Sequence, residues 1–290
     1  MLSILIPCYN FNVYKLVKDI YKQAKVLNIK YEIICIEDGS SKTFNNSKLK
    51  DLKNVYYLVN KNNIGRSKIR NLLAEKSKYN WLLFIDCDSE IVNKNYILKY
   101  VNNTKKSNII YYGKTVNPTK YKKNDNSLHW KYGKKVESKR KIKVFSSHHF
   151  LIEKKIFNTI HFDNKIEKYG HEDTIFYYQL KQKKYKFKFI DNPLIHAGLE
   201  KNKNYIIKTE QSIKNLIELE QRYDLNEIKI VKISKILSYF YINYILIFIF
   251  SKLETFLYKN LISKNPSLIL FQFYKLGFYC KNLKIFKNSN

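Results

Sequence analysis

The chain has 290 residues and a formal net charge of +30, from 54 lysine and arginine residues against 24 aspartate and glutamate residues. Its hydrophobic content of 45% and mean hydropathy of −0.42 argue against a multi-span membrane protein and fit a folded globular body. Only four of the cations are arginine, the usual reader of phosphates and guanine edges, which argues against a dedicated nucleic-acid-binding protein.

The cysteines and the first residues predict the compartment. Cys8, Cys35 and Cys87 lie within apolar, strand-like segments, and no Cys-x-x-Cys pair occurs, so we expect reduced and mostly buried thiols. Residues 1–7 have no basic region and too short an apolar stretch for a signal peptide, and we expect them to form a core strand. These features predict a cytoplasmic protein.

Apolar, strand-like runs alternate with helical patterns through the first 115 residues. We expect strands at 2–7, 33–36, 55–59, 81–85 and 109–112, and helices at 13–27, 64–76 and near 96–101. This alternation is typical of an α/β fold in which a mostly parallel central sheet is flanked by helices. Ligands of such folds bind at the carboxyl ends of the strands.

The apolar run at 81–85 ends at two carboxylates, Asp86 and Asp88. On an extended backbone this spacing points both side chains to one face, and their oxygens suit a hard divalent cation that bridges a diphosphate. The alternative interpretation is a strand that ends in a solvated acidic turn.

The second half of the chain is less regular. Residues 114–143 are polar, lysine-rich and without clear periodicity, and we expect a mobile segment there that lies beside a ligand site or forms a lid over it. A helix at 172–183 and a strand at 187–190 are expected next, followed by a lone His196.

The composition changes beyond residue 200. An amphipathic helix is expected at 205–223, a charge-free apolar run spans 236–250 between two lysines, and a second apolar helix is expected at 268–279. A membrane span needs about 20 apolar residues. The run could therefore pack on the preceding α/β domain, cross a membrane with its flanking lysines at the surface, or form an interfacial or dimer-forming helix. We expect peripheral membrane contact through 231–283 or a homodimer.

Five ordered motifs resemble family 2 glycosyltransferases of GT-A fold. They are Ile-Leu-Ile-Pro-Cys-Tyr-Asn at 4–10, Glu-Asp-Gly-Ser at 37–40, Asn-Ile-Gly at 63–65 followed by Arg70-Asn71, Asp-Cys-Asp at 86–88, and Gly-His-Glu-Asp at 170–173. The resemblance covers about residues 1–200. It implies a catalytic domain at 1–200, with a nucleotide-binding half at 1–115 and an acceptor half at 116–200, and leaves 201–290 as a helical extension.

The resemblance also implies an activity. An inverting hexosyltransferase would move a sugar from a nucleotide-diphospho-sugar, by family frequency a UDP-sugar, to an acceptor hydroxyl, with Mn²⁺ or Mg²⁺ as cofactor. No Gln-x-x-Arg-Trp motif follows residue 173, which points to addition of one sugar rather than polymerisation. The expected acceptor is a saccharide or lipid-linked saccharide of a surface glycan such as lipopolysaccharide or capsule, at the cytoplasmic face of the inner membrane.

Roles at the donor site follow from the same resemblance. Asp88 would bind the metal, Asp86 would lie nearer the ribose and the water shell of the metal, and His196 would lie on the metal or the diphosphate. The predicted contacts to the donor nucleotide are Pro7 and Tyr9 at the base, Asp38 as an acceptor of nucleoside hydrogen bonds, and Arg70 near the diphosphate. Alternatives remain: a buried turn for Pro7 and Tyr9, a cap for Asp38 and a solvated helix face for Arg70.

Asp173 would be the general base that deprotonates the acceptor hydroxyl, and Glu172 would orient the acceptor or support the base. Carboxylates at a helix N-terminus are also common as caps. His148, His149 and His171 lack the spacing of a metal site, so we interpret them as pocket or core groups, and we expect no zinc site. Two other functions remain open: a catalytically silent GT-A-like nucleotide-sugar-binding module, and a basic nucleic-acid-binding protein.

Overall fold

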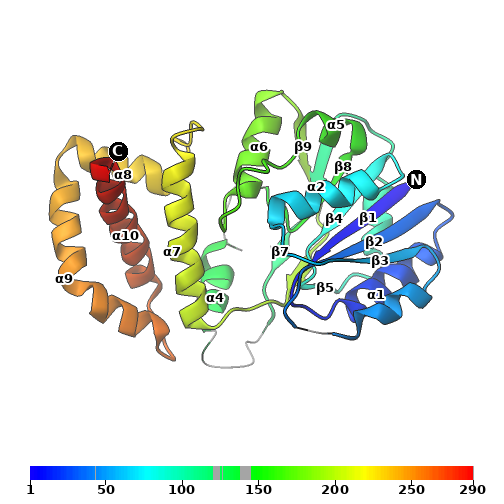
Figure 1. Cartoon of the computed structure of the whole chain (residues 1–290), viewed down its shortest axis with the longest axis horizontal. Helices are drawn as coiled ribbons and strands as arrows, with labels where there is room; N and C mark the ends of the chain where they lie inside the picture. The colour runs from blue at the N-terminus through cyan, green and yellow to red at the C-terminus, as the bar shows by residue number, and fades with distance from the viewer. Residues whose placement is uncertain (43, 120–124, 126, 138–144, 290) are drawn as a thin grey trace. The chain divides into compact units, whose positions relative to one another are not determined.

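The computed structural model describes residues 1–42, 44–119, 125, 127–137 and 145–289 (Figure 1). The chain divides into two compact units. An α/β unit contains residues 1–118, 140–167 and 172–198, and a helical unit contains residues 119–139, 168–171 and 199–290. All of the site residues predicted above lie in the α/β unit.

A seven-stranded sheet forms the centre of the α/β unit, in the order β3-β2-β1-β4-β8-β6-β9. Its strands are β1 (Leu2–Cys8), β2 (Tyr31–Asp38), β3 (Val55–Asn60), β4 (Trp81–Ile85), β6 (Ile109–Tyr112), β8 (His149–Glu153) and β9 (Lys186–Phe189). The four neighbouring strands β3, β2, β1 and β4 pair in parallel with one another, and β8 runs antiparallel to β4 and β6. Because β1, β2 and β4 are parallel neighbours, their carboxyl ends meet at one edge.

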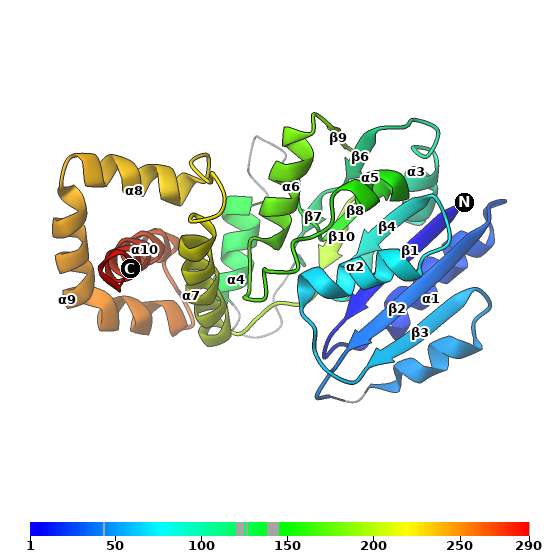
Figure 2. The ribbon, with the colours of Figure 1, turned by 45° about the horizontal axis from the view of Figure 1, so that its top comes forward.

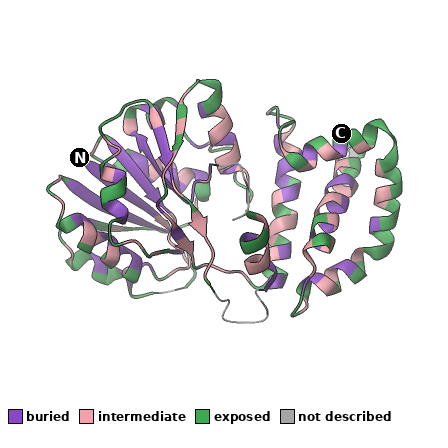
Figure 3. Cartoon of the chain, turned by 180° about the vertical axis from the view of Figure 1, so that it is seen from behind, coloured by how far each residue is buried: buried purple, intermediate pink, exposed green. Residues whose placement is uncertain are grey.

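Helices cover both faces of this sheet (Figure 2). Helices α1 (Tyr14–Lys25) and α3 (Tyr96–Val101) pack with the alternate strand residues that include Ile4, Ile33 and Leu83. The opposite set, including Leu5, packs with α2 (Arg66–Lys76), α5 (Lys154–Thr159) and α6 (Glu172–Gln182). Because both side-chain sets are apolar, β1 and β4 are almost unbroken apolar runs. The inner strands β1, β2, β4 and β8 are buried (Figure 3), whereas the outer strands β3 and β9 are partly exposed.

These elements confirm the predicted α/β fold with a mostly parallel sheet. The strands expected at 2–7, 33–36, 55–59, 81–85 and 109–112 and the helices expected in the first 115 residues all form, with ends shifted by a few residues. Strand β8, a 3₁₀ helix at Asn45–Asp51 and helix α5 were not predicted.

A second, three-stranded sheet has the order β5-β10-β7. It consists of β5 (Ser89–Ile91), β7 (Thr115–Val116) and β10 (Leu194–His196). Because β5 starts directly after Asp88 and β10 pairs His196 with Ser89, this sheet brings the late histidine beside the acidic turn. None of its strands was predicted.

The helical unit contains α4 (Ser127–Tyr132), a π-helical turn (Gly133–Glu137), α7 (Asn202–Leu219), α8 (Lys229–Tyr239), α9 (Ile242–Ile262) and α10 (Leu268–Ser289). The helix predicted at 205–223 corresponds to α7, and the one predicted at 268–279 continues to residue 289 as α10. Residues 120–124, 126 and 138–144, which belong to the predicted lid segment, lie outside the described residues. The remainder of that segment includes β7 and α4, where no regular structure was predicted.

The apolar run at 236–250 does not form one helix, and this part of the prediction was wrong. It is divided between α8 and α9, whose axes differ by 113°, and Tyr241 at the break has a left-handed φ of 60°. Both helices pack against α10. On α8, Ser234 Oγ lies 3.6 Å from Cys280 Sγ, and on α9 the ring of Phe250 lies 5.5 Å from that of Tyr274. Among the described residues, no single helix is long and apolar enough to cross a membrane. The bent pair of α8 and α9 reaches the required length and apolarity only when its two helices are taken together.

Candidate active site

The acidic pair lies where β4 ends. Strand β4 is buried over all five residues, and the chain turns at 86–88 before β5. The backbone N–H of Asp86 donates to the carbonyl of His148 at 2.9 Å, which ties the turn to the residue that precedes β8. The Asp86 and Asp88 side chains are each 28% exposed, so the turn presents two accessible carboxylates at the carboxyl edge of the sheet.

Asp88 belongs to a cluster with two histidines. His196 Nε2 lies 2.9 Å from Asp88 Oδ2, and ligand atoms of Asp88, His148 and His196 lie within 4.8 Å of one another. Asp88 and His196 were predicted from the sequence as residues of the metal site, whereas His148 was interpreted as a pocket or core group. His148 was missed because its place beside Asp86 depends on the antiparallel pairing of β8 with β4, which has no local sequence signature.

The surroundings of the cluster favour an ionised Asp88 and a neutral His148. Burial would raise the pKa of Asp88, but the hydrogen bond and the electrostatic interaction with His196, together with the positive charge of Arg66, hold this pKa below its usual range. Burial lowers the pKa of His148 despite the nearby carboxylates. A carboxylate and a neutral imidazole are the protonation states that bind metal ions.

This cluster fits a divalent metal. One carboxylate and two imidazoles form a mixed oxygen and nitrogen donor set, which Mn²⁺ accepts more readily than Mg²⁺. Gly198 lets the chain pass close to the carboxylate, since a Cβ there would lie 2.3 Å from Asp88 Oδ2. Asp86 does not belong to this cluster; its Oδ1 accepts a hydrogen bond from Arg70 Nη2, and its role toward the metal stays a prediction.

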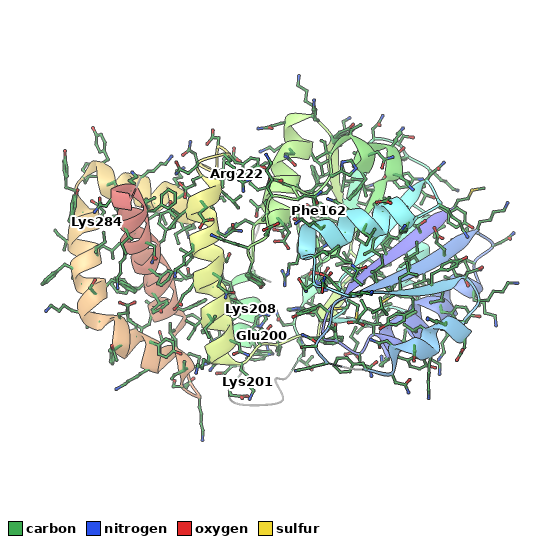
Figure 4. All side chains as sticks on the ribbon, viewed as in Figure 1. Phe162, Glu200, Lys201, Lys208, Arg222 and Lys284 are labelled. Atoms are coloured by element: carbon green, nitrogen blue, oxygen red, sulfur yellow. The ribbon has the colours of Figure 1, made fainter. Side chains whose placement is uncertain are left out.

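Arg70 joins the acidic turn to the first turn of α6. Its side chain is 4% exposed, with Nη2 2.7 Å from Asp86 Oδ1 and Nη1 3.6 Å from Glu172 Oε1. Its guanidinium lies 5.4 Å from the ring centroid of Phe162, which is labelled in Figure 4. Arg66, one turn earlier on α2, approaches the same Glu172 oxygen at 3.5 Å. The alternative of a solvated helix face is therefore wrong for Arg70, whereas its contact to a diphosphate stays a prediction.

Asp173 and Glu172 open α6, as the sequence predicts. Glu172 is buried, and the Thr174 N–H donates to Asp173 Oδ1 at 2.8 Å. Burial and the neighbouring negative charge of Glu172 raise the pKa of Asp173 to about 6, although Arg70 and Arg66 lower it in part. A carboxylate with this pKa is ionised at neutral pH and can still accept a proton, as a general base must.

Asp38 closes the loop that precedes α2. Its two carboxylate oxygens accept hydrogen bonds from the backbone N–H groups of Ile64 and Gly65, at 2.9 and 3.1 Å. The side chain is 3% exposed, and this geometry matches the capping alternative. Tyr9 is 49% exposed and Pro7 partly exposed, so both are accessible beside the end of β1. The nucleoside contacts of all three residues stay predictions.

Glu37 supports this end of the sheet, a role that the sequence analysis did not assign. Its buried carboxylate accepts hydrogen bonds from Tyr57 Oη at 2.8 Å, from Asn46 Nδ2 and Cys8 Sγ at 3.3 Å each, and from the Ser40 hydroxyl. The sequence feature that could have indicated this role is the position of Glu37, an acidic residue directly before Asp38 at the end of an apolar run.

The remaining histidines have structural partners. His149 is buried, with its Nδ1 3.0 Å from Tyr96 Oη and 2.7 Å from Tyr100 Oη, which confirms its interpretation as a core group. His171, in the helical unit, has a left-handed φ of 70° and its Nε2 lies 3.1 Å from Ser212 Oγ.

The family model described as "Glycosyl transferase family 2" matches residues 3–160, more than half of the chain. The chain belongs to glycosyltransferase family 2. No curated protein sequence matches this family 2 member significantly. Asp173 and His196 lie beyond the matched range.

Solved structures confirm the GT-A fold of this family 2 glycosyltransferase. A mannosyltransferase from Pyrobaculum calidifontis, in complex with GDP-Man and Mn²⁺, is 12% identical with a TM-score of 0.54, covering 77% of this chain and 64% of the mannosyltransferase. GalNAc-T7, with UDP, GalNAc and Mn²⁺, is 18% identical with a TM-score of 0.56, covering 81% of this chain and 50% of GalNAc-T7. The family 2 chain thus spans less than two thirds of either protein.

Proposed function

We propose that this family 2 glycosyltransferase transfers one sugar from a nucleotide-diphospho-sugar to an acceptor hydroxyl, with inversion at the anomeric carbon. The observation that carries the proposal is the bridge made by buried Arg70, which contacts Asp86 at 2.7 Å and Glu172 at 3.6 Å. It holds the acidic turn, suited to a donor diphosphate, next to the acidic pair that offers a base. Both parts of a transferase site therefore belong to one connected group of side chains.

In the proposed reaction, Asp173 accepts the acceptor hydroxyl proton while the acceptor oxygen attacks the anomeric carbon. The bond between that carbon and the β-phosphate oxygen breaks, and the nucleoside diphosphate leaves with the bonding electron pair. Asp88, His148 and His196 would hold the metal, which when bound neutralises the negative charge of the leaving diphosphate. Glu172, fixed by Arg66 and Arg70, orients the acceptor beside Asp173.

The donor and acceptor classes are proposed from the family resemblance and the ligands of the similar structures. The printed ligands of the two similar structures are GDP-Man in one and UDP with GalNAc in the other, each with Mn²⁺. A UDP-sugar remains the proposed donor, Mn²⁺ the proposed metal, and a saccharide or lipid-linked saccharide of a surface glycan the proposed acceptor. All four cysteines are free thiols, which suits the proposed cytoplasmic location.

The test combines donor binding with turnover. Thermal shift of the full chain with UDP-, GDP-, CMP- and dTDP-sugars, each with and without Mn²⁺, should give a metal-dependent rise for one nucleotide class. Release of the free nucleotide should then require a saccharide acceptor. Asp173→Asn should keep the thermal shift and lose turnover by at least about 10²-fold.

Three outcomes would contradict the proposal in different ways. Donor binding with no release, across a panel of lipid-linked and free saccharides, would favour a silent nucleotide-sugar-binding module. Binding of oligonucleotides with a steep salt dependence and no donor binding would favour a nucleic-acid-binding protein. Equal loss of binding and turnover in Asp173→Asn would mean that the base is another residue.

A further inference from the structure

The corner between α8 and α9 exposes a continuous apolar and aromatic surface. Its side chains, hereafter the aromatic corner, are Tyr239, Phe240, Tyr241, Tyr244, Ile245 and Phe248, which are between 55% and 78% exposed. The 113° bend places the first three at the tip, and Tyr244, Ile245 and Phe248 continue at helical spacing on the face of α9 opposite buried Phe250. Figure 3 shows this side of α9 as exposed.

Two lysines lie beside the aromatic corner. Lys252 Nζ lies 5.9 Å from the ring centroid of Phe248, and Lys284 Nζ, labelled in Figure 4, lies 5.1 Å from that of Tyr244. Residues 229–290 contain ten lysines and a single acidic residue, Glu254. Glu254 is already paired with Lys281 at 2.6 Å. The aromatic corner is therefore an apolar surface with positive charge beside it, in a segment with little negative charge.

We propose that the aromatic corner docks onto a lipid bilayer that carries anionic headgroups. Tyrosine and phenylalanine side chains partition into the boundary between headgroups and acyl chains, and lysines beside them meet the headgroup phosphates. A second copy of the chain fits less well, because a symmetric contact would bring the lysines of both copies together without acidic partners. The proposal goes beyond sugar transfer and does not depend on it.

Vesicle co-sedimentation of the full chain tests this docking. Binding to vesicles with about 30% phosphatidylglycerol should be at least tenfold stronger than to pure phosphatidylcholine and should weaken with added salt. Phe240→Ser/Ile245→Ser/Phe248→Ser should reduce it at least tenfold, because three exposed apolar contacts are lost. Lys252→Gln/Lys284→Gln should reduce binding to the anionic vesicles by a similar factor and leave the weak neutral binding unchanged.

Matched controls come from the α/β unit. Val26→Ser/Val59→Ser removes apolar side chains that are 80% and 63% exposed, and Lys105→Gln/Lys106→Gln removes two exposed lysines. Both controls should bind vesicles like the original chain, and all variants should keep its thermal unfolding midpoint. Equal binding to neutral and anionic vesicles, or equal losses in the controls, would overturn the proposal. So would a dimer by light scattering that only the aromatic-corner variant dissociates.

Discussion

Asp173 is the residue whose titration should set the acid limit of activity. Its pKa is raised to about 6 by burial and by Glu172, and a general base works only when unprotonated. The value of kcat/KM should therefore fall about tenfold for each pH unit below about 6. Glu172→Gln removes a charge that raises this pKa, so the acid limb should move to lower pH. Arg66→Gln removes a charge that lowers it and should move the limb upward.

Initial rates of nucleotide release between about pH 4.5 and 8 measure both shifts. The direction of the shift separates this explanation from a general loss of activity, because a damaged site lowers the rate without moving the limb in opposite directions. If both variants leave the limb in place, Asp173 is not the titrating base.

Arg70 should contribute far more to stability than Arg66, although both contact Glu172. Arg70→Gln leaves two carboxylates without their buried cation and should lower the free energy of unfolding by about 3–5 kcal/mol. The Arg66 side chain is 52% exposed, so Arg66→Gln should cost about 0–1 kcal/mol. Urea unfolding with an unchanged m-value measures the difference. Equal losses would show that the Arg70 bridge does not stabilise the fold.

The local sequence was sufficient to predict the strands that position the acidic turn. Strands β1, β2 and β4 are buried on both faces, so each is an apolar run that ends where polar residues must reach the site, as Ile85 is followed by Asp86. Asp88, Asp173 and the start of α6 were located by such patterns and by the family resemblance.

The rest depended on contacts between distant segments. His148 reaches the metal cluster only because β8 inserts antiparallel between β4 and β6, and β10, with three residues, is too short for a periodicity signal. The bend at Tyr241 follows from packing of α8 and α9 on α10 rather than from a proline or glycine in the run. Long-range packing therefore decided the features that the sequence analysis missed.

The segment after β10 should control the metal cluster through Gly198. Gly198→Ala places a Cβ 2.3 Å from Asp88 Oδ2 and 2.9 Å from Asp88 Cγ, so the carboxylate that contacts His196 must shift from its position. We expect Mn²⁺ affinity to fall about 10–100-fold, as is usual when support of a metal ligand is lost. Titration calorimetry with Mn²⁺ measures it, and Ala197→Ser, at an exposed neighbouring position, is the control. Unchanged Mn²⁺ affinity in Gly198→Ala would argue against Asp88 as a ligand.

The net charge of +30 should act on the whole molecule through self-repulsion. Charges of one sign in a compact chain oppose folding, and salt weakens this effect because the screening length falls from about 30 Å at 0.01 M to about 10 Å at 0.1 M. The thermal unfolding midpoint should therefore rise by a few degrees over that range. Sodium chloride and sodium sulfate compared at equal ionic strength separate screening from specific anion binding.

The same screening should act with the opposite sign on vesicle binding, because attraction between lysines and anionic headgroups is weakened by the ions that relieve repulsion within the chain. Across one salt series, the unfolding midpoint should rise while the bound fraction falls. A midpoint that stays constant or falls with salt would mean that the lysines lie too far apart to repel one another. In that case the basic composition would strengthen binding to anionic surfaces such as the vesicles, and it would not change the stability of the fold.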